Sequence, residues 1–101
     1  MTKHAGLPAP TRTSYALLTG ASQGIGEAMA RDLASRGYNV ILVARRQEVL
    51  DRIAAELKAQ HEVDAIALAA DLAKEADVDR VIEFMADKEI SIIVNSAGIA
   101  S

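Results

Sequence analysis

A glycine-rich turn is the part of this sequence best suited to bind a ligand, and it reads Thr19-Gly20-Ala21-Ser22-Gln23-Gly24-Ile25-Gly26. It follows the apolar run 16–18 and precedes an alanine-rich amphipathic segment, which is the strand, turn and helix order of a phosphate-binding site. Its glycines allow the backbone to turn sharply, to approach a pyrophosphate closely and to direct helix N-terminal amides at the charge. The turn therefore predicts a dinucleotide ligand.

The glycine spacing, G-x-x-x-G-x-G, differs from the G-x-G-x-x-G of many dinucleotide-binding folds, so a plain turn is the alternative interpretation. The apolar run before the turn and the helical pattern after it favour the nucleotide site. The P-loop of nucleoside triphosphatases is excluded, because the sequence lacks the Gly-Lys-Ser/Thr that this loop requires.

Two adjacent arginines, Arg45 and Arg46, follow the second predicted strand, about 20 residues after the turn, where NAD sites carry Asp or Glu for the ribose hydroxyls. Guanidinium groups instead pair with a ribose 2′-phosphate, which a carboxylate would repel, so this pair favours NADP (NADPH) over NAD. The alternative interpretation is a solvent-exposed pair at the start of a helix. A methyltransferase-like S-adenosylmethionine site also needs an acid here, and Arg45 argues against it.

Two later segments carry further candidates, each with two interpretations. Asp71 either accepts a hydrogen bond from an adenine amino group or caps the helix that follows it. The run Asn95-Ser96-Ala97-Gly98 either leaves room for a cofactor beside its small side chains or forms a generic turn.

An alternation of strands and helices must position these residues. Apolar residues recur every three or four positions in segments 24–36, 47–60 and 74–87, which predicts three helices, and Gly37 is expected to end the first. Short apolar runs predict strands at 15–18, 39–44, 64–69 and 90–94, and their continuous apolar character is typical of a parallel sheet covered on both faces. The order predicts an α/β fold, a doubly wound, Rossmann-like parallel sheet of about four strands in the order 3-2-1-4.

Composition narrows the class of protein. The 101 residues, half of them hydrophobic, suffice for one domain or a piece of one, and residues 1–13, with Pro8 and Pro10, are expected to form a flexible N-terminal tail. A net charge of -3 argues against nucleic-acid binding. The absence of an apolar run near about 18 residues argues against a membrane partner and favours a cytoplasmic location. No cysteine and two histidines predict no metal site.

Four motifs in the same order resemble the short-chain dehydrogenase/reductase family over residues 14–101, as the NADP-binding N-terminal half of its Rossmann-fold domain. The resemblance implies that the glycine-rich turn holds the pyrophosphate, the arginines the 2′-phosphate, Asp71 and Leu72 the adenine, and the segment after the fourth strand the nicotinamide-side ribose. Ser96 departs from the family's second Asn, so the structural role of that amide is lost or replaced. The implied cofactor-binding residues are Gly20, Ser22, Gln23, Gly24, Ile25, Gly26, Arg45, Arg46, Asp71, Leu72, Asn95, Ala97 and Gly98.

The family's catalytic Tyr-x-x-x-Lys pair has no match here, because the residues four positions after Tyr15 and Tyr38 are Thr19 and Leu42. Both tyrosines are interpreted as packing residues, and no catalytic residue is expected. The resemblance therefore implies the cofactor-binding portion of an oxidoreductase that moves hydride between a nicotinamide dinucleotide and a small carbonyl or alcohol, with the catalytic half absent.

The alternative is a non-catalytic nucleotide-binding or interaction module. The apolar fourth strand, residues 90–94, argues against a self-sufficient module, because it is expected to leave an exposed sheet edge, through which the chain would self-associate.

Overall fold

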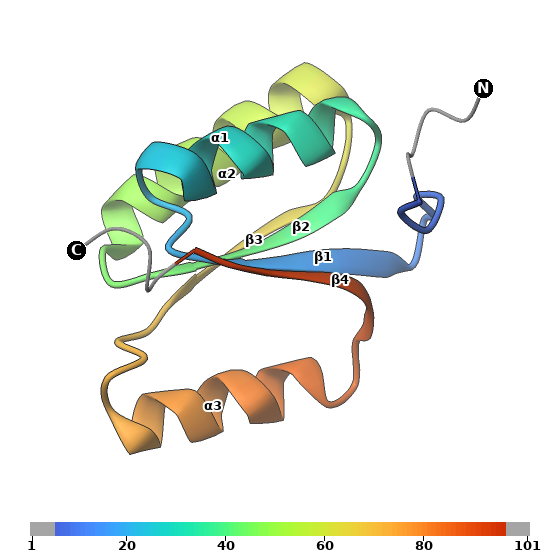
Figure 1. The fold of residues 1–101 in the computed structure, drawn as a ribbon. Helices are drawn as coiled ribbons and strands as arrows, with labels where there is room; N and C mark the ends of the chain where they lie inside the picture. Colours follow the sequence, from blue (N-terminus) through green and yellow to red (C-terminus); the bar gives the residue numbers. More distant parts are fainter. Residues whose placement is uncertain (1–5, 97–101) are drawn as a thin grey trace.

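A four-stranded parallel sheet forms the middle layer of the structure, a computed structural model that describes residues 6–96. Helices α1 and α2 cover one face of the sheet and α3 covers the other (Figure 1). The elements are β1 (Ser14–Thr19), α1 (Gly24–Ser35), β2 (Asn39–Ala44), α2 (Gln47–His61), β3 (Ala65–Ala69), α3 (Glu75–Met85) and β4 (Glu89–Asn95).

The strand order is β3-β2-β1-β4, with every neighbouring pair parallel. The predicted order 3-2-1-4 and the doubly wound arrangement are therefore confirmed. Helix α1 ends at Ser35, and Gly37 follows with a φ of 98°, a left-handed conformation that favours glycine and ends the helix as expected. The third helix ends two residues earlier than its apolar pattern predicts, since α3 stops at Met85 before the chain turns into β4.

Strand β2 is the centre of the core, which explains its unbroken apolar sequence. Val40 and Leu42 belong to the cluster under α1 and α2, whereas Ile41 and Val43 belong to the cluster under α3. All four side chains are 0% exposed. Because successive side chains of a strand point to opposite faces, a strand covered on both faces needs an apolar residue at every position.

A buried amide fastens the amino-terminal end of the sheet. The Nδ2 of Asn39 donates to the carbonyl oxygens of Arg12 at 3.1 Å and Ser14 at 3.2 Å, and its Oδ1 accepts from the Asp64 amide at 2.9 Å. One side chain thereby joins the segment before β1 to the segment before β3. Burial without these bonds would cost about 1–3 kcal/mol per unpaired group.

The two tyrosines lie away from the glycine-rich turn and serve the fold. Tyr38 is buried, and its hydroxyl donates to the carbonyl oxygen of Pro8, which holds part of the N-terminal segment against the sheet. The hydroxyl of Tyr15 donates to the carboxylate of Asp64, and this hydrogen bond, with burial second, raises the pKa of Tyr15 to about 12.

Strand β4 is less completely covered than its neighbour β1. It lies at an edge of the sheet and pairs with β1, with an irregular register at Tyr15 and Ala16. Ile93 of β4 is 62% exposed, and Ile82 of α3 is 58% exposed. None of the three helices in the described part of the chain combines the length and the hydrophobicity that a membrane crossing requires.

Candidate functional site

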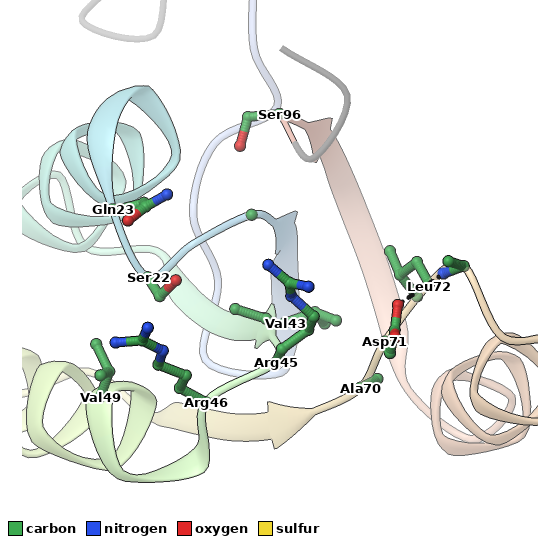
Figure 2. Close-up of a pocket in the computed structure, with 13 residues that line it drawn as sticks. Ser22, Gln23, Val43, Arg45, Arg46, Val49, Ala70, Asp71, Leu72 and Ser96 are labelled. Atoms are coloured by element: carbon green, nitrogen blue, oxygen red, sulfur yellow. Dashed lines mark hydrogen bonds between the residues drawn. The ribbon is translucent and has the colours of Figure 1, made fainter. Parts of the chain in front are cut away.

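The carboxyl ends of the strands border a cleft of about 380 Å³ (Figure 2). The turn after β1, the segments after β2 and β3, and the residue after β4 all reach it. In doubly wound sheets this edge is where ligands bind, at the point where the chain reverses direction across the sheet. The lining residues are Gly20, Ser22, Gln23, Val43, Ala44, Arg45, Arg46, Val49, Ala70, Asp71, Leu72, Ala73 and Ser96.

The backbone of the turn after β1 requires its glycines. Gly20 and Gly24 have φ values of 65° and 58°, in the left-handed region that other L-residues rarely adopt. A Cβ atom on Gly26 would lie 2.0 Å from the carbonyl oxygen of Gly20 and 2.5 Å from the Oγ of Ser96. The first turn of α1 can therefore pack against the turn that precedes it only because position 26 has no side chain.

The N-terminus of α1 presents amides without helical partners. Its N-cap residue, Gln23, is extended and makes no side-chain capping hydrogen bond, and the first helical amide bond runs from Glu27 to the Gln23 carbonyl at 3.3 Å. The amides of Gly24, Ile25 and Gly26 precede that bond, so the helix itself offers them no acceptor. Unpaired amides and the positive end of the helix dipole together suit an anion.

Arg45 and Arg46 border the cleft at the end of β2. Both side chains are exposed, and Arg46 is also the N-cap residue of α2. Figure 2 shows both side chains among the lining residues, with the guanidinium group of Arg46 directed towards Ser22. Within residues 6–96 neither arginine forms an ion pair, so both guanidinium groups are available to an anionic ligand.

The segment between β3 and α3 supplies the opposite wall. The Oδ1 of Asp71 accepts from the amide of Ala73 at 3.0 Å, so this carboxylate orders its own loop. It does not cap α3, whose N-cap residue is Lys74. The amide of Asp71 donates to the Oδ2 of Asp77 at 2.7 Å, and this bond is the main reason that the pKa of Asp77 is lowered. Leu72 is half-buried and packs against the core under α3.

The end of β4 is tied to the end of β1 by two side chains. The Thr19 hydroxyl donates to Asn95 Oδ1 at 2.6 Å, and the buried Ser96 hydroxyl donates to the Thr19 carbonyl oxygen at 2.5 Å. Ser96 thus bonds the backbone at the position where the resemblance leads one to expect an amide. Ala97 and Gly98 lie outside the described residues.

The cleft brings together seven of the residues singled out in the sequence, namely Gly20, Ser22, Gln23, Arg45, Arg46, Asp71 and Leu72. Gly24, Ile25, Gly26 and Asn95 shape the turn or the strand end without lining the cleft. The lining residues that the sequence analysis missed as site residues are Val43, Ala44, Val49, Ala70, Ala73 and Ser96. For all of these except Val49, which lies in α2, a position at or shortly after the carboxyl end of a strand was the available signal. Residues 6–96 contain no group of three metal-ligating side chains.

Comparison with known proteins finds relatives of this chain. A family model described as short chain dehydrogenase matches residues 14–101. The very-long-chain 3-oxoacyl-CoA reductase of Anas platyrhynchos is 38% identical over 92 residues, which cover 90% of this chain and 30% of that protein. The chain therefore spans less than a third of that curated relative.

Two solved structures are also similar. A short-chain dehydrogenase from Sphingobium yanoikuyae in complex with NADPH is 42% identical with a TM-score of 0.75, over 79% of this chain and 32% of that one. The bulky-bulky ketone specific alcohol dehydrogenase from Comamonas testosteroni is 36% identical with a TM-score of 0.76, over 82% of this chain and 34% of that one.

The contact at Gly26 predicts a specific cost for one methyl group. Gly26→Ala should lower the free energy of unfolding by about 2 kcal/mol, because the new Cβ must displace the Gly20 carbonyl or Ser96. Urea denaturation of the purified protein measures this. Ala28→Ser, at an exposed position of the same helix, should change it by less than about 0.5 kcal/mol. Equal values for the two variants would contradict the packing argument.

Proposed function

The chain belongs to the short-chain dehydrogenase family, and we propose that it is the NADP-binding portion of an oxidoreductase that moves hydride between NADPH and a carbonyl or alcohol. One observation carries the proposal. A single cleft combines an uncapped helix N-terminus, two arginines without ion pairs in the described residues, and a loop with a carboxylate and an apolar side chain. These are complementary to a pyrophosphate, a ribose 2′-phosphate and an adenine.

The glycine-rich turn fits the pyrophosphate. The backbone amides from Ser22 to Gly26 would donate to its oxygens, because those at the start of α1 precede the first helical hydrogen bond. Gly20 and Gly24 adopt left-handed conformations that let the main chain approach a ligand with no Cβ in the way. Gly26 keeps the helix close enough to direct these amides at the cleft.

The arginine pair decides the cofactor in this proposal. Arg45 and Arg46 would pair with the 2′-phosphate of NADP, and the absence of an acidic residue there removes the usual partner of the NAD ribose hydroxyls. The similar Sphingobium yanoikuyae enzyme was solved with NADPH, which supports the same preference.

The remaining contacts to the cofactor would come from residues at or just after the ends of β3 and β4. Asp71 and Leu72 would take the adenine, one by a hydrogen bond to the amino group and the other by apolar contact. Asn95, with Ala97 and Gly98 outside the described residues, would adjoin the nicotinamide-side ribose, and the Thr19 hydroxyl holds the Asn95 side chain at the end of β1.

The hydride chemistry itself belongs to the nicotinamide, while the proton must come from a side chain near the substrate. We propose that this side chain lies in polypeptide beyond these 101 residues, because neither Tyr15 nor Tyr38 precedes a lysine by four positions. Both hydroxyls are also engaged in the fold, with Asp64 and with Pro8. The relatives named for ketone and 3-oxoacyl-CoA substrates support a carbonyl compound as the substrate.

The second candidate is a module that binds the nucleotide without redox chemistry. It is favoured by the missing Tyr-x-x-x-Lys pair in a chain that matches less than a third of its curated relative. The two candidates differ in one measurement on the product that the gene encodes. Oxidation of NADPH on addition of a ketone supports the oxidoreductase, and cofactor binding with no oxidation supports the module.

The edge strand β4 predicts self-association of these residues. Ile93 lies on that strand and is 62% exposed, so pairing of two β4 edges would bury it. Ile93→Lys should raise the monomer–dimer Kd by about tenfold or more in analytical ultracentrifugation, because a charge on an edge strand opposes pairing. Ile82→Lys, on α3, should leave that Kd within about twofold. A monomer at every concentration would contradict the proposal.

The cofactor assignment predicts that removal of one guanidinium group weakens the binding of NADPH selectively. Arg45→Ala should raise the Kd for NADPH by about tenfold or more and the Kd for NADH by less than about twofold, because a charged hydrogen bond contributes about 1.5–3 kcal/mol. Isothermal titration calorimetry at fixed salt measures both values. Arg52→Ala, an exposed arginine of α2 outside the cleft, is the matched control. An equal loss for the two nucleotides would overturn the 2′-phosphate assignment.

A further inference from the structure

We propose that Asp77 and Arg80, two residues of α3 outside the cleft, are positioning residues that set the loop carrying Asp71 and Leu72 for the adenosine end of the nucleotide. The proposal rests on the proposed function, since it assigns a role within the same site. It concerns side chains that would act on the ligand through the loop and would not touch it.

The two side chains hold the backbone on either side of Ala70. The Asp77 Oδ2 accepts from the Asp71 amide at 2.7 Å, and the Arg80 guanidinium donates to the carbonyl oxygen of Ala69 at 2.7 Å. The Ala70 amide itself donates to the Ala44 carbonyl oxygen at 2.7 Å, which continues the ladder between β3 and β2. The Ala69 carbonyl oxygen and the amides of Ala70 and Asp71 therefore each have a hydrogen-bond partner outside this short segment.

The pair is also linked internally, because Arg80 lies 3.6 Å from the other Asp77 oxygen. The carboxylate has two partners of positive or partly positive character, and the lowered pKa of Asp77 shows that its charged form is favoured. Asp77 lies in the first turn of α3, where a carboxylate is also favoured by the helix dipole. The Asp77 carboxylate thus connects α3 to the loop that precedes it.

This arrangement has a consequence for the cleft wall. Asp71 makes three hydrogen bonds that shape the loop: its Oδ1 accepts from the Ala73 amide, its carbonyl oxygen accepts from the Lys74 amide at 2.9 Å, and its amide donates to Asp77. Of these, the bond to Asp77 fixes the side of the loop next to β3, and its loss would let the Asp71 carboxylate and Leu72 shift relative to Arg45 across the cleft. A misplacement of this kind weakens only the ligand parts that these residues contact.

The experiment compares two probes that occupy different ends of the site. Adenosine 2′-monophosphate carries the adenine and the 2′-phosphate without a 5′-phosphate, and inorganic pyrophosphate carries only the group assigned to the glycine-rich turn. Asp77→Ala should raise the Kd for adenosine 2′-monophosphate by about tenfold and leave the Kd for pyrophosphate within about twofold. Asp77→Asn, which keeps an acceptor oxygen, should give an intermediate value. Asp79→Ala, at an exposed acid of α3 two residues further along, should change neither Kd.

The outcomes separate failure of the proposed nucleotide binding from failure of the positioning role of Asp77. If wild-type protein binds neither probe, the proposed function fails and this inference fails with it. If wild-type protein binds both probes and Asp77→Ala binds each with the wild-type affinity, only the positioning role is overturned. An equal loss of affinity for both probes also overturns it, since such a loss indicates general disruption of the fold. Hydrogen exchange of the Asp71 amide that is about tenfold faster in ligand-free Asp77→Asn than in wild-type protein would support the role of the Asp77 hydrogen bond even where Asp77→Ala does not fold.

Discussion

The close approach of α1 to the strand end that precedes it is the constraint on which the site depends. The helix begins against the Gly20 carbonyl and the Ser96 hydroxyl, at a distance that excludes even a Cβ at Gly26. The same Ser96 hydroxyl bonds the Thr19 carbonyl oxygen, so β1, α1 and β4 meet at one point. The direction of the helix amides, the depth of the cleft and the position of the β4 end are all set by this contact.

The two ends of the sheet are organised differently because they serve different purposes. At the amino-terminal end, the Asn39 side-chain amide and the Tyr15 hydroxyl form hydrogen bonds with neighbouring segments of the chain. At the carboxyl end, exposed guanidinium groups and helix amides are without partners among the described residues. The groups available to a ligand therefore gather at the carboxyl edge, where ligands bind in doubly wound sheets.

Much of this architecture follows from local sequence pattern. The unbroken apolar run of β2 predicts a central strand, and Gly37 predicts the end of α1, because burial on both faces and a left-handed turn each leave a direct mark on residue type. The place of Arg45 and Arg46 beside the cleft follows from their position directly after β2 and from their distance in sequence to the glycine-rich turn. What pattern could not predict depends on contacts between distant segments: the bond from Asp77 to the Asp71 amide, the bond from Ser96 to Thr19, and the place of Val49 on the cleft wall. The two interpretations of Asp71, a hydrogen bond to an adenine amino group and a helix cap, were indistinguishable in sequence because both use its carboxylate as an acceptor. The bond from the Ala73 amide to this carboxylate was not predicted.

The position of β4 in the sheet also bears on how the chain reaches this fold. Bonds between β1 and the end of β4 join residues 77 positions apart, as in Ser96 and Thr19, whereas Ser14 and Asn39 of β1 and β2 are 25 apart. Loop-closure entropy rises with the logarithm of this separation, so the β1-α1-β2 and β2-α2-β3 units, whose strands pair over similar short separations, cost less to close than the pairing of β1 with β4. During synthesis these units can form before β4 leaves the ribosome, and until then one edge of β1 stays open to other chains. The strand whose end completes the cleft is therefore also the one whose late arrival exposes the nascent polypeptide to mispairing.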